Sequence, residues 1–225
     1  LIIAVDRYGP AEWRLRTPVK DGKALAKLLK GDYGFKEIVE LYDDQATVPA
    51  IKREIAKLAE KAGKRDSVLI YFAGHGQYQG GTGYWIPANA KPREWWNWLE
   101  HILIRDMIKT QRFPARHVLV VSDSCYSAAL FRSATIPAKV VPEYVRRAMR
   151  TPARQCLTSG GLAPVADGGG GEHSVFARYF LKCLKNPPRD VFVPSDIMPD
   201  LKQNVGDNAP AIKGERQVPI LGVLT

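Results

Sequence analysis

The sequence is short of cysteine and has no long apolar run, and both shortages exclude classes of protein. Its three cysteines, Cys125, Cys156 and Cys183, are odd in number and widely spaced. This pattern argues against a disulfide framework or a zinc cluster and favours a reducing compartment, so we expect a cytoplasmic protein. No apolar run approaches the roughly 20 residues that a membrane-spanning helix needs, so we expect no membrane partner.

Acidic residues are outnumbered as well, because 33 Lys and Arg residues stand against 23 Asp and Glu residues, for a net charge of +10. Such an excess can indicate a nucleic acid or an acidic partner. Here the basic residues are scattered along the chain, and they form no DNA- or RNA-binding motif. We therefore expect no nucleic-acid partner.

Length and composition fit one large globular domain or two small ones. A chain of 225 residues, 45% apolar and 25% charged, can bury a substantial core. It begins without methionine in the strand-like segment Leu1–Val5, so we expect a fragment of a longer chain, with regulatory domains fused to it or bound by it. Proline and arginine are frequent in Arg132–Arg154, which we interpret as a linker.

Apolar segments typical of buried strands alternate with amphipathic segments typical of helices. The expected strands are Leu1–Val5, Glu37–Tyr42, Val68–Ala73, Val118–Ser122 and Val218–Leu224, with a further strand around Cys156. The expected helices are Val19–Lys30, Thr47–Ala62, Leu103–Thr110 and Ser174–Leu184. This alternation predicts a mostly parallel sheet that is covered by helices on both faces.

Two of the expected strands end in residues that can carry chemistry. Val68–Ala73 stops at Gly-His-Gly, which presents His75, and Val118–Ser122 stops at Asp-Ser-Cys, which presents Cys125. In open α/β sheets ligands bind beyond the carboxyl ends of the strands, so neighbouring strands would bring these two side chains together. A cysteine needs a base or a positive neighbour to form its thiolate near neutral pH, and a histidine supplies it.

Each of the two residues alone has an ordinary structural explanation. A single cysteine after an apolar strand is most often a small buried hydrophobe, and a single histidine between glycines is most often a loop residue. The matched placement of the pair favours a shared site. The remaining histidines, His101, His117 and His173, have no partner at catalytic spacing in the sequence.

A resemblance to the caspase-like cysteine peptidases of clan CD, family C14, is carried by four segments: YFAGHGQY, YWIPANA, VLVVSDSCYSA and LTSGGLAPVADGGGGEHSVFARYFLKCL. It is strongest for the prokaryotic caspase homologues and metacaspases, the orthocaspase-like group. The resemblance implies a three-layer α/β/α sandwich with a six-stranded, mostly parallel sheet and a single peptidase domain over residues 1–225. Residues 1–131 would correspond to the large subunit, 132–154 to the linker and 155–225 to the small subunit.

The resemblance also implies catalytic roles. Cys125 would attack the peptide carbonyl, His75 would activate it and protonate the leaving amine, and the main-chain N–H groups of Gly76 and Cys125 would hold the oxyanion. The separation of 50 residues agrees with the spacing of histidine and cysteine in caspases. The segment SDSCYS departs from the Gln-Ala-Cys-x-Gly of true caspases, which speaks against cleavage after aspartate.

The resemblance assigns substrate binding to Asp21, Asp123 and Ser159, because aspartates matching the first two form an acidic pocket in metacaspases. Asp6 is a weaker candidate for this pocket. We therefore expect an endopeptidase that cleaves after Arg or Lys, in a regulated prokaryotic stress, cell-death or defence pathway. Alternatively, Asp21 caps a helix and Asp123 braces the turn that holds the nucleophile.

No cofactor or metal is expected. Many metacaspases require calcium, an ion that takes six to eight oxygen ligands. Neither Gly76–Lys91 nor Tyr126–Val141 contains an acidic residue, so we expect activity without calcium.

Two other functions stay open. The chain could be a catalytically inactive caspase-like scaffold, or a different Cys–His hydrolase such as a glutamine amidotransferase, although in those enzymes the nucleophile precedes the histidine. For the peptidase, we expect activation by a cut in the linker after one of Arg146, Arg147, Arg150 and Arg154, unless this segment is only a solvated basic helix.

Overall fold

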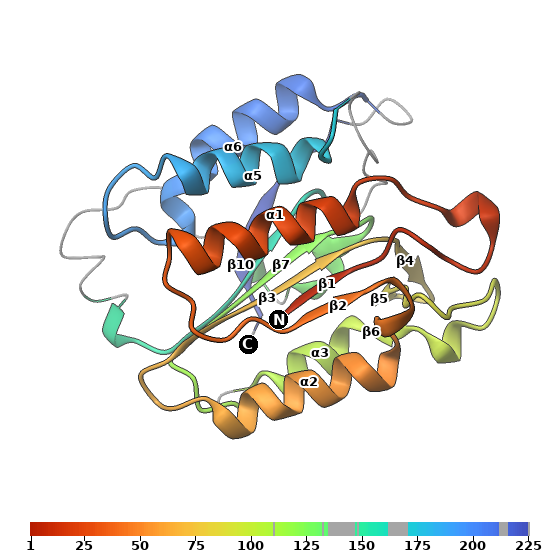
Figure 1. Ribbon diagram of the computed structural model, residues 1–225, viewed down its shortest axis with the longest axis horizontal. Coiled ribbons are helices and arrows are strands. Elements are labelled where there is room, and N and C mark those ends of the chain that lie inside the picture. The colour runs from red at the N-terminus through yellow and green to blue at the C-terminus, as the bar shows by residue number, and fades with distance from the viewer. Residues whose placement is uncertain are drawn as a thin grey trace.

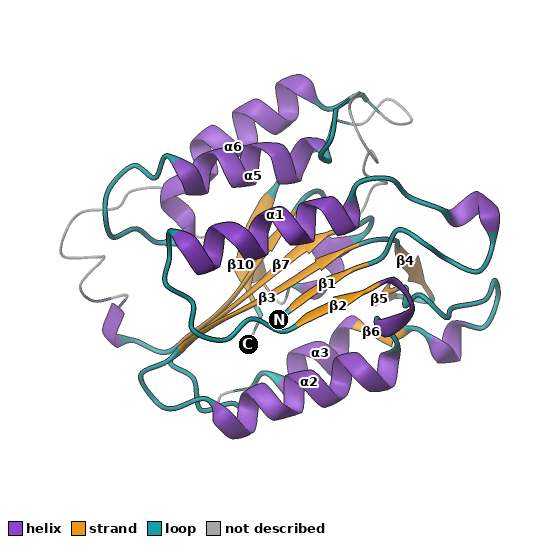
Figure 2. Ribbon diagram, viewed as in Figure 1, coloured by secondary structure: helices purple, strands orange, loops and turns teal. Residues whose placement is uncertain are grey.

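The computed structural model describes residues 1–109, 111–131, 133–134, 147, 149–161, 171–211 and 216–224. Within them a mixed β-sheet lies between two layers of helices, as the ribbon and its colouring by secondary structure show (Figure 1 and Figure 2).

Among the described residues, six strands of three or more residues lie in the order β2-β1-β3-β7-β9-β10, and a two-residue strand follows β10. The six are β1 (Ile2–Ala4), β2 (Glu40–Tyr42), β3 (Ser67–Ala73), β7 (His117–Asp123), β9 (Ala153–Thr158) and β10 (Ile220–Val223). The first five are parallel and β10 runs antiparallel to β9, while the two-residue strand β8 (Ser133–Ala134) pairs with the outer edge of β10. The expected six-stranded, mostly parallel sheet is confirmed.

Helices cover both faces of this sheet. One layer holds α1 (Pro18–Gly31), α5 (Val175–Lys185) and α6 (Pro194–Asn208), and the other holds α2 (Val48–Lys61) and α3 (His101–Met107) (Figure 1). The described residues also form four short 3₁₀ helices: η1 (Ala11–Trp13), η2 (Asp43–Gln45), η3 (Trp95–Asn97) and η4 (Ser127–Leu130). The three-layer sandwich is therefore confirmed.

Alternating side chains of the central strands fill two separate apolar cores. In β3, Ile70 and Phe72 pack toward α2 and α3, whereas Tyr71 and Ala73 pack toward α1, α5 and α6. Successive side chains of a strand point to opposite faces, so a strand that is buried on both sides must be apolar throughout. This is why the continuous apolar runs in the sequence predicted the central strands.

Two elements were missed by the sequence analysis. After His75 the chain forms a small antiparallel sheet of β4 (Gly76–Gln79), β5 (Thr82–Trp85) and β6 (Leu99–Glu100). The other missed element is α6, which carries Pro199 in its interior. None of the helices in the described part of the chain is long and apolar enough to cross a membrane.

Arg154 corrects one expectation. Instead of lying in an exposed linker it lies in β9 and is buried, with 3% of its surface exposed. Its guanidinium group donates hydrogen bonds to five main-chain carbonyl oxygens, those of Ile108, Phe113, Ala115, Arg116 and Ala153. A cut after Arg154 is therefore not expected in the folded chain, and Arg146 lies outside the described residues.

Candidate active site

His75 and Cys125 follow the last paired residues of β3 and β7. The two strands pair in parallel up to Ala73 and Asp123, so each candidate residue lies two positions beyond the same rung of the ladder. Both side chains line one small cavity of about 100 Å³ at the carboxyl end of the sheet. The structure thus brings together the two residues that the sequence singled out.

The imidazole of His75 is held in a defined orientation. Its Nε2 atom lies 2.7 Å from the main-chain carbonyl oxygen of Trp13. Because a carbonyl oxygen only accepts hydrogen bonds, the neutral ring carries its proton on Nε2, and Nδ1 keeps the lone pair. The main-chain N–H of His75 donates to the hydroxyl of Tyr8 over 2.8 Å, and the Tyr8 ring lies 4.8 Å from the imidazole.

Gly76 and Cys125 approach each other through their main chains. A side-chain carbon added to Gly76 would overlap the carbonyl oxygen of Cys125, so only glycine fits at this position. The turn that follows β7 is tight, because Tyr126 has the left-handed φ of 57° that is uncommon outside glycine. The Ser127 hydroxyl closes it by donating to the carbonyl oxygen of Ser124 over 2.8 Å. The two residues whose main chains are expected to hold the oxyanion are therefore adjacent.

Asp21 and Asp123 form an acidic wall of the same cavity. Asp21 lies in the first turn of α1 and is 1% exposed, and Asp123 ends β7 and is 8% exposed. Ser174 joins them, because its main-chain N–H donates to Asp21 over 3.2 Å and its hydroxyl donates to Asp123 over 2.6 Å. The same hydroxyl caps α5 by accepting from the N–H of Ala177 over 2.9 Å.

His173 also contacts this wall, which the sequence analysis missed. Its Nδ1 atom lies 2.5 Å from Oδ1 of Asp21, and the two residues are 152 positions apart in the chain. The only sequence signal was a Gly-rich run followed by His-Ser immediately before an apolar helix. The structure places His173 beside Asp21, which the resemblance assigns to substrate binding.

Burial and a neighbouring carboxylate shift the protonation of Asp21. Burial and, next, the negative charge of Asp123 raise the pKa of Asp21 from 3.8 to about 8. Burial lowers the pKa of the His173 imidazole. Both shifts favour the neutral forms of the two groups, a protonated carboxyl group on Asp21 and an uncharged imidazole on His173.

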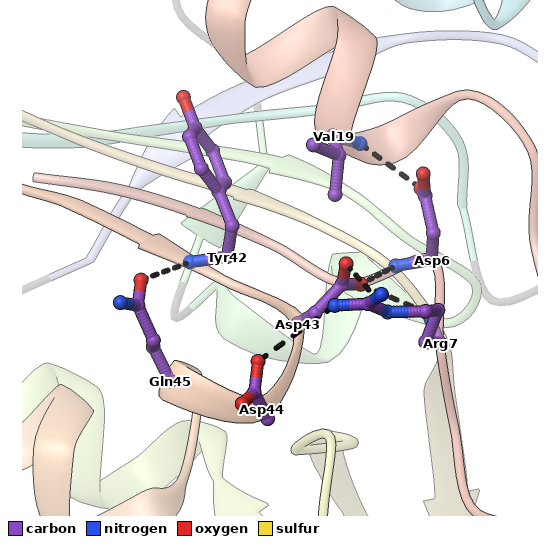
Figure 3. Close-up of polar contacts among 7 residues, drawn as sticks. All are labelled: Asp6, Arg7, Val19, Tyr42, Asp43, Asp44 and Gln45. Carbon is purple, nitrogen blue, oxygen red and sulfur yellow. Dashed lines mark hydrogen bonds and ion pairs between the residues drawn. The ribbon is translucent and has the colours of Figure 1, made fainter.

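The loop from β1 to α1, which carries Tyr8 and Trp13, is tied to the end of β2 (Figure 3). The carboxylate of Asp43 accepts hydrogen bonds of 2.9 Å from the main-chain N–H groups of Asp6 and Arg7. Asp6 in turn accepts from the N–H of Val19 in the first turn of α1, over 3.0 Å. Asp6 thus acts at the start of the helix and is not among the residues that line the cavity.

Other candidate residues lie away from this cavity. Ser159 is fully buried after β9 and does not line it, and its hydroxyl has no hydrogen-bond partner among the described residues. Cys156 is buried in the core, which raises the pKa of its thiol. His101 is buried near Trp85, and burial lowers its pKa to about 3, so it is neutral. No three His, Cys, Asp or Glu side chains of the described residues are grouped to hold a metal ion.

Comparison with known families identifies the class of protein. The profile of Peptidase C14, the caspase domain, matches residues 1–223. The chain therefore belongs to this family, which supports a cysteine protease acting on a peptide or protein. Among curated proteins, none matches the chain.

Two solved structures of related fold support this assignment. A protein from Geobacter sulfurreducens is 18% identical, with a TM-score of 0.64 over 98% of this chain and 90% of its own. Caspase-1 from Spodoptera frugiperda is 16% identical, with a TM-score of 0.65 over 99% of this chain and 84% of its own. At this level of identity the similarity establishes the caspase fold.

Proposed function

We propose that this chain is a cysteine endopeptidase that uses Cys125 as nucleophile and His75 as base, and that it cleaves after Arg or Lys. The observation that carries the proposal is the single cavity lined by Cys125, His75, Asp21 and Asp123. A nucleophile, a base and an acidic wall are the three parts that such a reaction needs.

The hydrogen bond between His75 and Trp13 supports the role of the base. With Nε2 donating to the Trp13 carbonyl, Nδ1 is the atom that would take the proton of the Cys125 thiol. The thiolate would attack the peptide carbonyl, and His75 would then deliver the proton to the leaving amine. Water would release the acyl group from the sulfur and restore the thiol.

The close approach of Gly76 to Cys125 supports the expected oxyanion site. Two main-chain N–H groups directed at the developing charge would stabilise the tetrahedral intermediate. Losing one donor of this kind costs on the order of 100-fold in rate. Most substitutions leave a main-chain N–H group in place. The oxyanion site is therefore tested by replacing Gly76 with alanine, because the added carbon would force the main chains apart.

The acidic wall supports a basic side chain before the scissile bond. A guanidinium group would compensate the negative charge of Asp123, favour loss of the proton from Asp21 and form paired hydrogen bonds with carboxylate oxygens. An aspartate side chain would place a further negative charge beside these two carboxyl groups and would be rejected.

The function is tested with fluorogenic peptides ending in Arg, Lys or Asp before the reporter group. Wild type should cleave the Arg and Lys peptides, and Cys125→Ala should be inactive while keeping the wild-type melting temperature. Cys156→Ala is the matched control. Activity that survives in Cys125→Ala would exclude this nucleophile, and a folded wild type that cleaves none of the peptides would favour a scaffold.

We further propose that the peptidase works in a regulated prokaryotic stress, cell-death or defence pathway and needs no calcium. Limited proteolysis after a basic residue suits regulation, because it yields defined products instead of full degradation. Ser159 remains a proposed substrate contact that would require a shift after β9, since it is buried away from the cavity.

A further inference from the structure

A second and larger cavity, of about 730 Å³, lies at the opposite edge of the sheet. It opens where β3, β7 and β9 begin, at the amino ends of the strands whose carboxyl ends carry the active-site candidates. The cavity lies on the face of the sheet that α1, α5 and α6 cover nearer the carboxyl ends of the strands. Nothing in the proposed peptidase mechanism uses it.

Strand register builds the floor of this cavity. Two rows of side chains from the three parallel strands face the same side of the sheet, because successive rows are two residues apart. The rows are Ser67, His117 and Ala153, and then Leu69, Leu119 and Gln155. The floor is thus apolar at its centre, with a serine–histidine contact of 3.2 Å and a glutamine at its margins.

Two aromatic side chains complete the apolar lining. Phe35 follows the end of α1, and Phe192 precedes the start of α6. Both are partly buried against the core beneath the three upper helices. A ligand in this cavity would therefore contact leucine side chains on one side and aromatic rings on the other.

The charged side chains among the described lining residues are all positive. Arg65, Arg116 and Arg147 line the cavity, and none of the described lining residues is acidic. The neighbouring carboxylate of Asp66 accepts from the N–H of Gly63 over 2.8 Å and does not line the cavity. The guanidinium group of Arg116 donates to the main-chain carbonyl of Met149, over 3.3 Å, and within the described chain it has no carboxylate partner.

We propose that this cavity binds a small amphipathic organic anion, with an apolar body and a carboxylate, sulfonate or phosphate head. Pockets of roughly 300–1,000 Å³ that combine apolar walls with a few convergent polar groups are typical small-molecule sites. Guanidinium groups pair with such heads through parallel hydrogen bonds. An inorganic anion would leave the leucine and phenylalanine surface unused, and a neutral apolar ligand would leave the arginines unpaired.

The test uses the fluorescent probe 8-anilinonaphthalene-1-sulfonate, an aromatic sulfonate of suitable size, with the folded wild-type chain. We expect saturable binding of one probe per chain. The uncharged analogue N-phenyl-1-naphthylamine should bind about tenfold more weakly or worse, because it lacks the head that pairs with guanidinium. Equal affinity for the two probes, or binding that does not saturate, would overturn the proposal.

Variants locate the probe. Arg65→Gln/Arg116→Gln should weaken sulfonate binding about tenfold or more, and Ala153→Phe should block it by filling the floor. Lys52→Gln/Arg53→Gln, on α2 across the sheet, removes the same charge and should leave binding within about twofold. Equal weakening by both double variants would show that only the net charge of the protein matters. That result would overturn the proposed site. Thermal melting shows that each variant is folded.

This proposal stands apart from the peptidase. Cys125→Ala should bind the probe like wild type, so a failure of catalysis and a failure of anion binding would be separate results. If the probe competes with peptide substrate and the arginine substitutions leave its binding unchanged, the probe binds in the active-site cavity. That result would exclude the second site.

Discussion

The imidazole of His173 lies 2.5 Å from the carboxyl group of Asp21, at the acidic wall of the candidate active site. The imidazole therefore occupies a hydrogen-bonding position that the guanidinium group of a substrate would need. Binding of a basic side chain must break or rearrange this contact. His173 is partly exposed, with 29% of its side chain accessible, so it has room to move away.

Replacing His173 with alanine should strengthen binding of an arginyl substrate. The competing contact is lost, so the KM for the Arg peptide should fall about three- to tenfold while kcat stays within twofold. Steady-state kinetics of the Arg peptide measure this, with the exposed neighbour variant Glu172→Ala as the control. A rise in KM would mean that His173 helps to hold the substrate.

Affinity for a basic ligand should rise with pH. The pKa of Asp21 is raised to about 8, so below this pH a cation must displace a proton. In that range, binding should strengthen by up to about tenfold for each unit by which the pH is raised. The change should level off above pH 8. Calorimetry of a peptide ending in arginine amide, with Cys125→Ala to prevent reaction, measures this.

Asp21→Asn is the control for that profile, since an amide cannot ionise. It should bind the peptide weakly and independently of pH over the same range. If wild type binds equally at pH 6 and pH 8, the ionisation of Asp21 does not govern recognition.

Arg154→Met should destabilise the fold strongly. The substitution removes hydrogen bonds to five main-chain carbonyl oxygens and leaves buried acceptors unpaired, at a cost of about 3 kcal/mol or more. In a chain of this size the melting temperature should fall by about 10 °C. Arg150→Met, on an exposed side chain, is the matched control and should melt like wild type. Equal melting of both variants would show that the carbonyl contacts contribute little.

Activity should persist without calcium. Cleavage of the Arg peptide in an excess of calcium chelator should match cleavage with added calcium, because the segments after the two candidate catalytic residues lack carboxylates. A strict dependence on calcium would show that carboxylates from elsewhere in the chain assemble an ion site.

The sequence predicted the centre of the molecule well, for a physical reason. Strands buried on both faces are continuous apolar runs, so β3 and β7 were visible, and the chemistry at their ends followed from the geometry of parallel sheets. His75 and Cys125 were found in this way. Their catalytic roles stay predictions until the variants are measured.

Other features could not be predicted from local pattern. The strands of the small sheet are two to four residues long, too short to show periodicity, and Pro199 masks α6 because proline is rare inside helices. Arg154 is buried because main-chain carbonyl oxygens between α3 and β7 face its guanidinium group. The spacing of residues in the sequence gives no sign of this arrangement. The contact of His173 with Asp21 depends on tertiary folding alone.

The register of β3 and β7 gives a different meaning to the spacing of the candidate pair. Ser67 pairs with His117 and Ala73 with Asp123, so every rung joins residues 50 positions apart, and His75 and Cys125 differ by the same 50. The difference of 50 is set by the length of the chain that connects the two strands. The proximity of the two side chains comes from their equal position, two residues beyond the last paired residues. Residues inserted between β6 and β7 would change the number and leave the pair in place. One residue inserted between Ala73 and His75 would keep every rung and still separate the pair.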